Sequence, residues 1–307
     1  MLISRPIFAQ PVDINKEKLL ELLQAEVQEY NKAIATDKGD WIVKGFIDVA
    51  KNIYTITIDT KVVSKVMEIL LIPAFYKFAE KHDLTLELPP QQNFYPDLSF
   101  TDNKTGLKYA VDIKSTFKDS ANKIKSLTLG AFTGYFRNRE SSKNTLYPYG
   151  SYEAHLVLGV IYSQIEKSPM EKTVYTIDEL QEIESVIRDF QFFVQPKYKI
   201  ASASPGSGNT KNIGSTNTIS KLINGEGVFA SLGEEVYDDY WTNYLTTDMA
   251  NSAGIKRPYT NLKSYLEYKE RAISALAGKK DVIEKLSAED EAESAETDII
   301  NEDEVDE

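Results

Sequence analysis

The chain of 307 residues contains no cysteine. This absence excludes disulfide bonds, thiol catalysis and cysteine-ligated zinc. Histidine is almost as scarce: His82 and His155 are the whole complement, too few for a histidine-rich metal site. Any metal ion must therefore be held mainly by carboxylate oxygens, which are the ligands that hard cations such as Mg²⁺ prefer.

Long apolar runs are missing as well. The N-terminal segment lacks the apolar core of a signal peptide, and no stretch reaches the roughly 18 apolar residues that a membrane span requires. We therefore expect a cytoplasmic protein with no membrane partner. Hydrophobic residues make up 42% of the chain and charged residues 27%, which are ordinary values for a globular protein.

Positive charge is in deficit, and the deficit is local. The chain has 35 basic and 47 acidic residues, a net charge of −12. The segment from Leu286 to Glu307 holds eleven of the acidic residues and no Lys or Arg, so 36 acidic residues remain against the 35 basic ones. Such a near-neutral body can carry a basic cleft. The acidic end has too little apolar surface to fold, which predicts a disordered tail over residues 286–307.

The hydrophobic patterns predict an α+β protein with a central mixed β-sheet flanked by helices. We expect an N-terminal helical extension over residues 1–40 and one main domain over residues 41–285. Ser, Gly, Asn and Thr dominate residues 202–220, which predicts an exposed loop or a pair of turns. The expected helices span residues 13–35, 59–72, 73–82, 236–244 and 262–276, and the expected strands span 41–58 (a strand pair), 84–88, 95–100, 108–116, 155–162 and 190–200.

Candidate catalytic residues lie on the predicted hairpin of residues 95–100 and 108–116. Because strand residues two apart share a face, Asp112 and Lys114 project to the same side. Symmetric pairing about the Lys104–Thr105 bond would set Asp97 opposite Asp112. Two carboxylates about 5 Å apart at Cβ repel each other unless a cation lies between them. A divalent metal ion together with Lys114 would compensate them, and could activate water and stabilise charge on a phosphate.

Taken alone, a short D-x-K pattern is more typical of a solvated strand face with Asp97 in a turn. A series of further segments extends the pattern, and in order and spacing it resembles the EcoRV family of restriction endonucleases, within the PD-(D/E)xK nuclease superfamily. The resemblance covers roughly residues 45–271. The segments are Asp59-Thr60-Lys61-Val62, Ala79-Glu80-Lys81-His82, Gln91-Gln92-Asn93, Tyr95-Pro96-Asp97, Asp112-Ile113-Lys114, Thr128-Leu129-Gly130, Arg137-Asn138, Gly206-Ser207-Gly208-Asn209-Thr210 and Asn212-Ile213-Gly214-Ser215.

For the chemistry, the resemblance implies that Asp97 and Asp112 bind Mg²⁺ and that Lys114 orients the nucleophilic water. Glu68 matches a further acidic residue of the family's site, as catalytic group and metal ligand. Lys61 and Glu68 lie within about 20° of one helix face, which could point toward DNA. The alternative for Glu68 is a surface ion pair with Lys65 at i, i+3.

For DNA recognition, the resemblance implies that the loop Gly206–Asn212 enters the major groove, with Ser207, Gly208, Asn209, Thr210 and Lys211 between its ends. Gln91, Gln92 and Asn93 match a segment that approaches the minor groove, where amide side chains suit the degenerate pattern. Lys61 and Thr128 complete the expected DNA-binding set.

Read without the family, the two loops are a flexible turn and a solvated loop, and neither has the ending of a phosphate-binding P-loop. The sequence also departs from the family. Lys211 replaces a threonine and Phe94 a histidine, and several arginines are missing after Trp241, where Lys256 and Arg257 could substitute.

The function implied is that of a homodimeric type II restriction endonuclease acting on double-stranded DNA. The implied site is GATATC, cut at its centre to leave blunt ends with 5′-phosphates, with residues 41–58 as the dimer contact. Because a palindrome presents the same base pattern twice, a dimer with twofold symmetry can bind both halves in the same way. Two alternatives remain. A structure-selective repair nuclease would share the triad of Asp97, Asp112 and Lys114 but lack the two DNA-recognition loops. A DNA-binding module without catalysis would be free to lose one residue of the triad.

Overall fold

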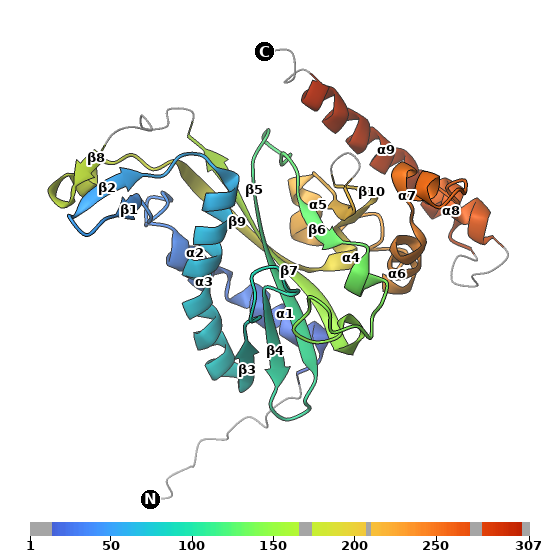
Figure 1. Cartoon of the computed structure of the whole chain (residues 1–307), viewed down its shortest axis with the longest axis horizontal. Coiled ribbons are helices and arrows are strands. Elements are labelled where there is room, and N and C mark those ends of the chain that lie inside the picture. Colours follow the sequence, from blue (N-terminus) through green and yellow to red (C-terminus); the bar gives the residue numbers. More distant parts are fainter. Residues whose placement is uncertain (1–13, 166–173, 207–209, 271–277, 303–307) are drawn as a thin grey trace, which may run out of the picture.

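A five-stranded mixed sheet forms the centre of the computed structural model, which describes residues 14–165, 174–206, 210–270 and 278–302, the last ten of these as backbone alone. The strand order is β3-β4-β5-β7-β9 (Figure 1). β5 and β7 run parallel and the other neighbours antiparallel, so the predicted α+β class with a mixed sheet is confirmed. The strands span Leu84–Glu87 (β3), Leu98–Asp102 (β4), Lys108–Phe117 (β5), Tyr152–Gln164 (β7) and Ile187–Pro196 (β9).

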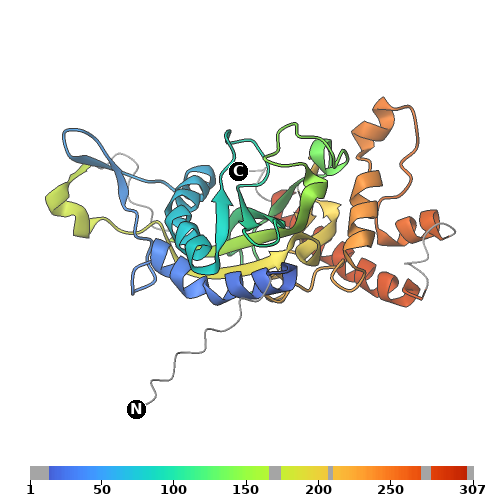
Figure 2. The ribbon, with the colours of Figure 1, turned by 90° about the horizontal axis from the view of Figure 1, so that it is seen from below.

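Both faces of this sheet are covered. On β7, Leu156 and Leu158 pack into one core while Val157 and Ile161 pack into another, as the alternation of a strand requires. The first core lies under the helices α1 (Lys16–Ala25), α2 (Val27–Ile34) and α3 (Thr60–His82). These helices lie along one side of the sheet (Figure 2). Residues 16–34, expected as an extension, therefore pack onto the central sheet.

The helices of this layer differ in two places from the prediction. The expected single helix over residues 13–35 is divided at Glu26, and Asn15 caps its first half through the Lys18 amide. The break expected at Pro73 is absent, because α3 runs on through the proline to His82. A proline removes one backbone hydrogen bond. Burial of Leu71 and Phe75 on either side of it keeps the two halves in line.

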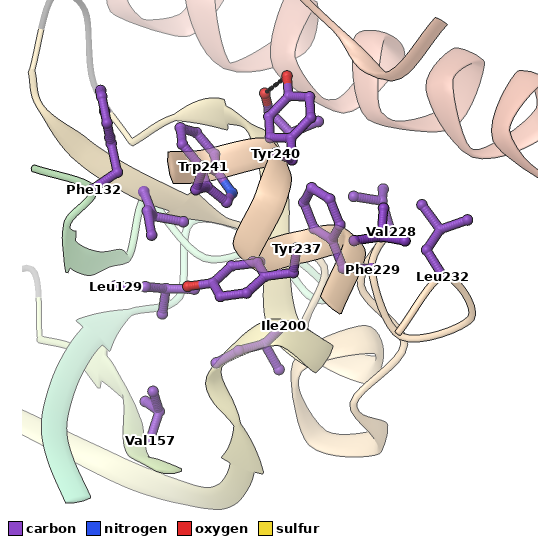
Figure 3. Packing of buried hydrophobic residues seen from close by; sticks show 14 of the residues in the cluster. Leu129, Phe132, Val157, Ile200, Val228, Phe229, Leu232, Tyr237, Tyr240 and Trp241 are labelled. Atoms are coloured by element: carbon purple, nitrogen blue, oxygen red, sulfur yellow. Dashed lines mark hydrogen bonds between the residues drawn. The ribbon is translucent and has the colours of Figure 1, made fainter. Parts of the chain in front are cut away.

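The second core joins the sheet to a smaller sheet of order β10-β11-β6, which spans Ala201–Pro205, Asn212–Ser215 and Thr128–Ala131 respectively. Aromatic side chains fill this core, among them Phe132, Phe229, Tyr237, Tyr240 and Trp241 (Figure 3). The elements around it are η1 (Gly134–Phe136), η2 (Tyr149–Ser151), α5 (Ile219–Asn224), α6 (Glu234–Asn243), α7 (Thr247–Ser252) and α8 (Leu262–Lys269).

Two predictions for this half of the chain were wrong. The strand expected over residues 190–200 ends at Pro196, and Lys197–Ile200 form the short helix α4. The polar segment 202–220, expected as a loop or turns, contains most of β10 and all of β11. Small residues can form strands here because Ala201, Ala203 and Ile213 are buried against the aromatic core.

A third sheet projects from the body beyond α3 (Figures 1 and 2). It has the order β1-β2-β8, with β1 at Gly45–Ile47, β2 at Asn52–Thr55 and β8 at Val174–Thr176, and η3 (Ile177–Glu182) follows β8. The strand pair expected between residues 41 and 58 is confirmed by β1 and β2.

Most of the predicted disordered tail is helical, because Lys280–Glu302 form α9, while residues 303–307 lie outside the described residues (Figure 1). Ile283 and Leu286 pack against the aromatic core, and Ser287 and Asp290 are buried on the same side. These positions follow the i, i+3, i+4, i+7 pattern of one helix face. The prediction failed because the stripe begins upstream of the acidic run. Along the described part of the chain, no helix is long and apolar enough to cross a bilayer.

Candidate active site

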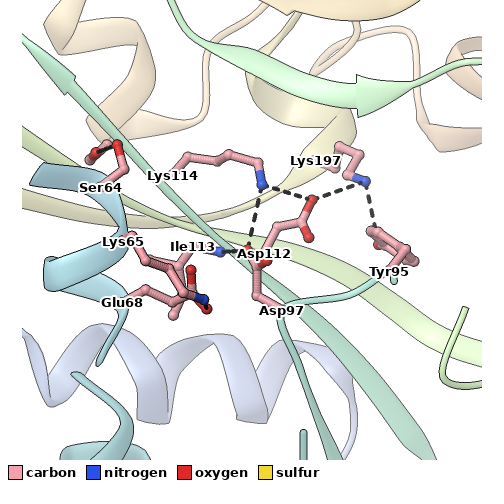
Figure 4. Close-up of polar contacts among 10 residues, drawn as sticks. Ser64, Lys65, Glu68, Tyr95, Asp97, Asp112, Ile113, Lys114 and Lys197 are labelled. Atoms are coloured by element: carbon pink, nitrogen blue, oxygen red, sulfur yellow. Dashed lines mark hydrogen bonds and ion pairs between the residues drawn. The ribbon is translucent and has the colours of Figure 1, made fainter. Parts of the chain in front are cut away.

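Asp97, Asp112 and Lys114 meet at the middle of the central sheet (Figure 4). The pairing of Leu98 with Val111 gives the hairpin the register expected from symmetry about the Lys104–Thr105 bond. Asp97 directly precedes β4, and Asp112 and Lys114 lie on one face of β5. Lys114 Nζ lies 3.5 Å from Asp97 Oδ2 and 3.5 Å from Asp112 Oδ2.

Asp112 is buried, whereas Asp97 and Lys114 are partly buried. Asp112 is 4% exposed, and Asp97 Oδ2 accepts a 2.7 Å hydrogen bond from the Ile113 amide. Burial raises the pKa of Asp97; Lys114 partly offsets this, and the charge of Asp112 adds to it. Burial alone would lower the pKa of Lys114, but Asp112 and Asp97 together raise it above its usual value. The ammonium thus compensates two carboxylates that would otherwise repel.

The donor set fits a hard divalent cation. Both acidic groups offer oxygen, and neither histidine side chain is among the contacts of Asp97 or Asp112. Oxygen ligands of this kind are those of Mg²⁺. Lys114 carries positive charge to the point where the repulsion between the carboxylates would otherwise be greatest.

An open cleft of about 570 Å³ lies over the site. The N-terminal turns of α3 form one wall of the cleft, and the C-terminal half of β5 with the start of β6 forms the other. Ser64 Oγ on α3 lies 2.6 Å from Ser115 Oγ on β5. The lining includes six of the predicted site residues, namely Lys61, Glu68, Gln92, Asp97, Lys114 and Thr128. Lys65 and Lys125 add two further cations, so the cleft suits a polyanion.

Glu68 lies in the lining of the same cleft. It shares a face of α3 with Lys61, as expected, but its carboxylate lies 2.6 Å from Lys65 Nζ. Within the described residues, no three acidic or histidine side chains are grouped closely enough to share a metal ion. The Lys65 pair is thus formed in this structure, and the role of Glu68 as a third metal ligand stays a prediction.

The predicted recognition loop begins beside the cleft. Gly206 and Asn212 close the β10–β11 hairpin through a 3.1 Å bond between the Gly206 amide and the Asn212 carbonyl. Gly206 lies against Thr128, a cleft residue. The Lys211 carbonyl accepts a bond from the Phe132 amide, and the Lys211 side chain is exposed. The predicted contacts Ser207, Gly208 and Asn209 lie outside the described residues, and Thr210 follows them at the start of the return to β11.

The remaining predicted DNA contacts lie near the surface. Gln91 and Asn93 are exposed in the loop between β3 and β4. Lys256 is exposed as well, whereas Arg257 donates a 2.6 Å hydrogen bond to the Tyr244 hydroxyl and stacks over its ring. The guanidinium of Arg257 is therefore used within the protein, which leaves Lys256 as the cation available at that position.

Sequence reasoning missed Lys197. Its ammonium lies 3.7 Å from Asp112 Oδ2 and 3.3 Å from the Tyr95 hydroxyl, on the side of Asp112 away from Lys114 (Figure 4). The side chain is 3% exposed. Pro196 ends β9 one residue earlier, so α4 turns this lysine into the interior. An isolated lysine within a predicted strand gives no signal in the sequence.

In sequence, the chain matches one family of enzymes. The family described as restriction endonuclease EcoRV matches residues 37–270. The type II restriction enzyme EcoRV of Escherichia coli is 35% identical over 235 residues, which is 76% of this chain and 93% of that enzyme. Among solved structures, NlaIV restriction endonuclease aligns with a TM-score of 0.33 at 8% identity, covering 86% of this chain and 93% of the other.

Proposed function

Because the chain belongs to the EcoRV family of restriction endonucleases, and so is a type II site-specific deoxyribonuclease, we propose that it hydrolyses double-stranded DNA with Mg²⁺ as its cofactor. The proposed site is the palindrome GATATC, cut at its centre to leave blunt ends with 5′-phosphates. The observation that carries the proposal is the meeting of Asp97, Asp112 and Lys114 under a lysine-lined cleft. Because the proposed substrate is double-stranded DNA, we place the protein in the cytoplasm.

The catalytic roles follow from the side-chain chemistry. Asp97 and Asp112 are the proposed Mg²⁺ ligands. The cation, when bound, would stabilise charge that develops on the scissile phosphate and would lower the pKa of a water molecule. Lys114 presents its ammonium between the two carboxylates, where it can orient the attacking water and a phosphate oxygen by hydrogen bonds. Burial of Asp112 keeps bulk water from weakening these interactions.

DNA recognition is assigned to the loops around the cleft. We propose that Gly206–Asn212 read the major groove and that Gln91–Asn93 approach the minor groove. Lys61 and Thr128, which line the cleft, would contact the backbone or the bases beside it. These two loops favour a sequence-specific enzyme over a structure-selective repair nuclease, and the complete triad favours an active enzyme over a bare DNA-binding module.

We propose that a homodimer binds the palindrome and that each protomer places its active site at one DNA strand. The third sheet supports this assembly. Large apolar side chains stand exposed on it, which is the usual mark of a protein contact. They are Phe46, Ile47, Val49, Tyr54 and Val174. The proposed domain arrangement keeps residues 41–58 as the dimer contact of an endonuclease domain over residues 41–285.

Cleavage of a plasmid that carries GATATC tests the catalytic assignment. Asp97→Asn, Asp112→Asn and Lys114→Ala should each lower the rate in Mg²⁺ by roughly 10²–10³-fold. Asp37→Asn, which removes an exposed carboxylate, should cut like the wild type. Glu68→Gln should cause a smaller loss, because Glu68 is paired with Lys65. Rates within tenfold of wild type for any of the first three variants would contradict the assignment.

A further inference from the structure

Lys197 contacts the proposed metal ligand Asp112 and the neighbouring Tyr95. Its ammonium lies 3.7 Å from Asp112 Oδ2, 3.3 Å from the Tyr95 hydroxyl and 4.4 Å from the centre of the Tyr95 ring. With 3% of the side chain exposed, it has almost no water to solvate it. A buried ammonium is costly unless it is paired, so these contacts must supply the compensation.

A polar chain continues from Lys197 into the interior. Lys197 donates to the Tyr95 oxygen, so the single hydroxyl hydrogen of Tyr95 is available to His155 Nδ1, 2.7 Å away. Tyr149 stacks on the His155 ring with centroids 3.7 Å apart. Burial, with the nearby charge of Lys197, lowers the pKa of His155 well below its usual value, so its imidazole accepts this bond in the neutral form. These hydrogen bonds hold the Lys197 side chain in place from the buried side.

The two lysines that flank Asp112 differ in their surroundings. Lys114 Nζ and Lys197 Nζ both approach the same oxygen, Asp112 Oδ2, at 3.5 Å and 3.7 Å. Lys114 is 25% exposed and lines the cleft, whereas Lys197 is enclosed by aromatic rings. A cation or phosphate that enters the cleft can displace Lys114 from Asp112. It cannot displace Lys197 without opening the core.

We propose that Lys197 is a positioning residue: it holds Asp112 by Oδ2 from the buried side and sets how tightly the two aspartates bind a cation. The inference rests on the proposed function, in which Asp97 and Asp112 are the metal ligands. Its consequence is twofold. Removing the charge of Lys197 strengthens cation binding, because two carboxylates are then opposed by one ammonium. The same change slows cleavage, because Asp112 loses the contact that orients it.

Binding of Tb³⁺, a hard cation that nearby tyrosines sensitise, gives a readout that does not depend on cleavage. Tyr95 and Tyr135 lie beside the two aspartates and stack on each other. Asp97→Asn should abolish the signal, which assigns it to this site. Lys197→Met should bind Tb³⁺ roughly tenfold tighter than the wild type, and should cleave DNA at least roughly tenfold more slowly at saturating Mg²⁺.

Lys199→Met is the matched control, because Lys199 lies on the same short helix and is not in contact with Asp112 among the ion pairs of the described residues. It should match the wild type in both measurements. If Lys197→Met fails to fold by circular dichroism, Lys197→Gln, which keeps hydrogen-bond donors without the charge, carries the same expectations.

Unchanged Tb³⁺ affinity in a folded Lys197 variant, with or without a lower melting temperature, would overturn the proposal by reducing the lysine to a structural role. Failure of the proposed function gives a different result. The wild type would then bind Tb³⁺ through Asp97, and Lys197→Met would still bind it more tightly, while no DNA would be cut.

Discussion

At the scale of single residues, the contact between Gly206 and Thr128 couples the predicted reading loop to the cleft. A Cβ at position 206 would lie 2.4 Å from Thr128 Cγ2. Because threonine is stiff at χ1, this methyl group cannot easily turn away. Gly206→Ala should therefore distort the base of the hairpin at a cost of about 1–3 kcal/mol. We expect cleavage of the cognate site to fall at least roughly tenfold, while non-specific binding, which rests on phosphate charge, persists.

Thr128→Ser is the matched partner for this experiment, because serine keeps the hydroxyl and deletes the obstructing methyl group. The double variant Gly206→Ala/Thr128→Ser should recover most of the lost cleavage, and a double-mutant cycle measures the coupling. Additive losses in the cycle would show that the two residues do not interact in the functional enzyme.

The catalytic residues show which contacts a sequence can predict. Asp97, Asp112 and Lys114 belong to one hairpin, so strand alternation and the symmetry of a short turn were enough to bring them together. Lys197 reaches Asp112 from the end of β9, across β7. That contact depends on the order of strands in the sheet, which no local pattern contains. Glu68 shows the reverse case, because its local partner Lys65 prevails in the structure.

At the scale of elements, α9 is an integral part of the fold. Ile283 is fully buried and Leu286 packs on the same core, and Asp290 Oδ2 accepts a 3.2 Å hydrogen bond from the Ala203 amide of β10. Ile283→Ala should lower the free energy of unfolding by about 2–5 kcal/mol. Val282→Ala, on the exposed side of the same helix, should change it by less than about 0.5 kcal/mol. Thermal melts of the two variants measure the difference, and equal melting temperatures would mean that α9 is not docked in solution.

Element boundaries were harder to predict than element types. The strand pair of the third sheet, the hairpin and β7 were expected because alternation and β-branched residues mark them. The prediction of a helix break at Pro73 was wrong because packing on both sides of the proline outweighs the lost hydrogen bond. The acidic end was judged by its composition, whereas its buried stripe is shared with residues that precede the acidic run.

At the scale of the whole molecule, the proposed homodimer is assigned to the third sheet. Phe46 and Ile47 on β1 are 53% and 60% exposed. Introducing charge there, as Phe46→Glu/Ile47→Glu, should prevent association because a buried carboxylate at an interface is strongly unfavourable. Sedimentation should then show a monomer, and the rate of double-strand cleavage should fall greatly. Tyr76→Glu, at a similarly exposed residue on α3 away from this sheet and from the cleft lining, should remain dimeric and active. A dimeric, active double variant would place the interface elsewhere.

Sequence-specific cleavage is the central claim, and mapping the cut ends tests it most directly. A DNA of known sequence is incubated with the 307-residue chain in Mg²⁺, and the new ends are ligated to adaptors and sequenced. We expect blunt ends carrying 5′-phosphates at the centre of every GATATC, and no cleavage in EDTA. Cuts at another palindrome would revise the specificity alone. Ends scattered without regard to sequence, or intact DNA in Mg²⁺, would contradict the account.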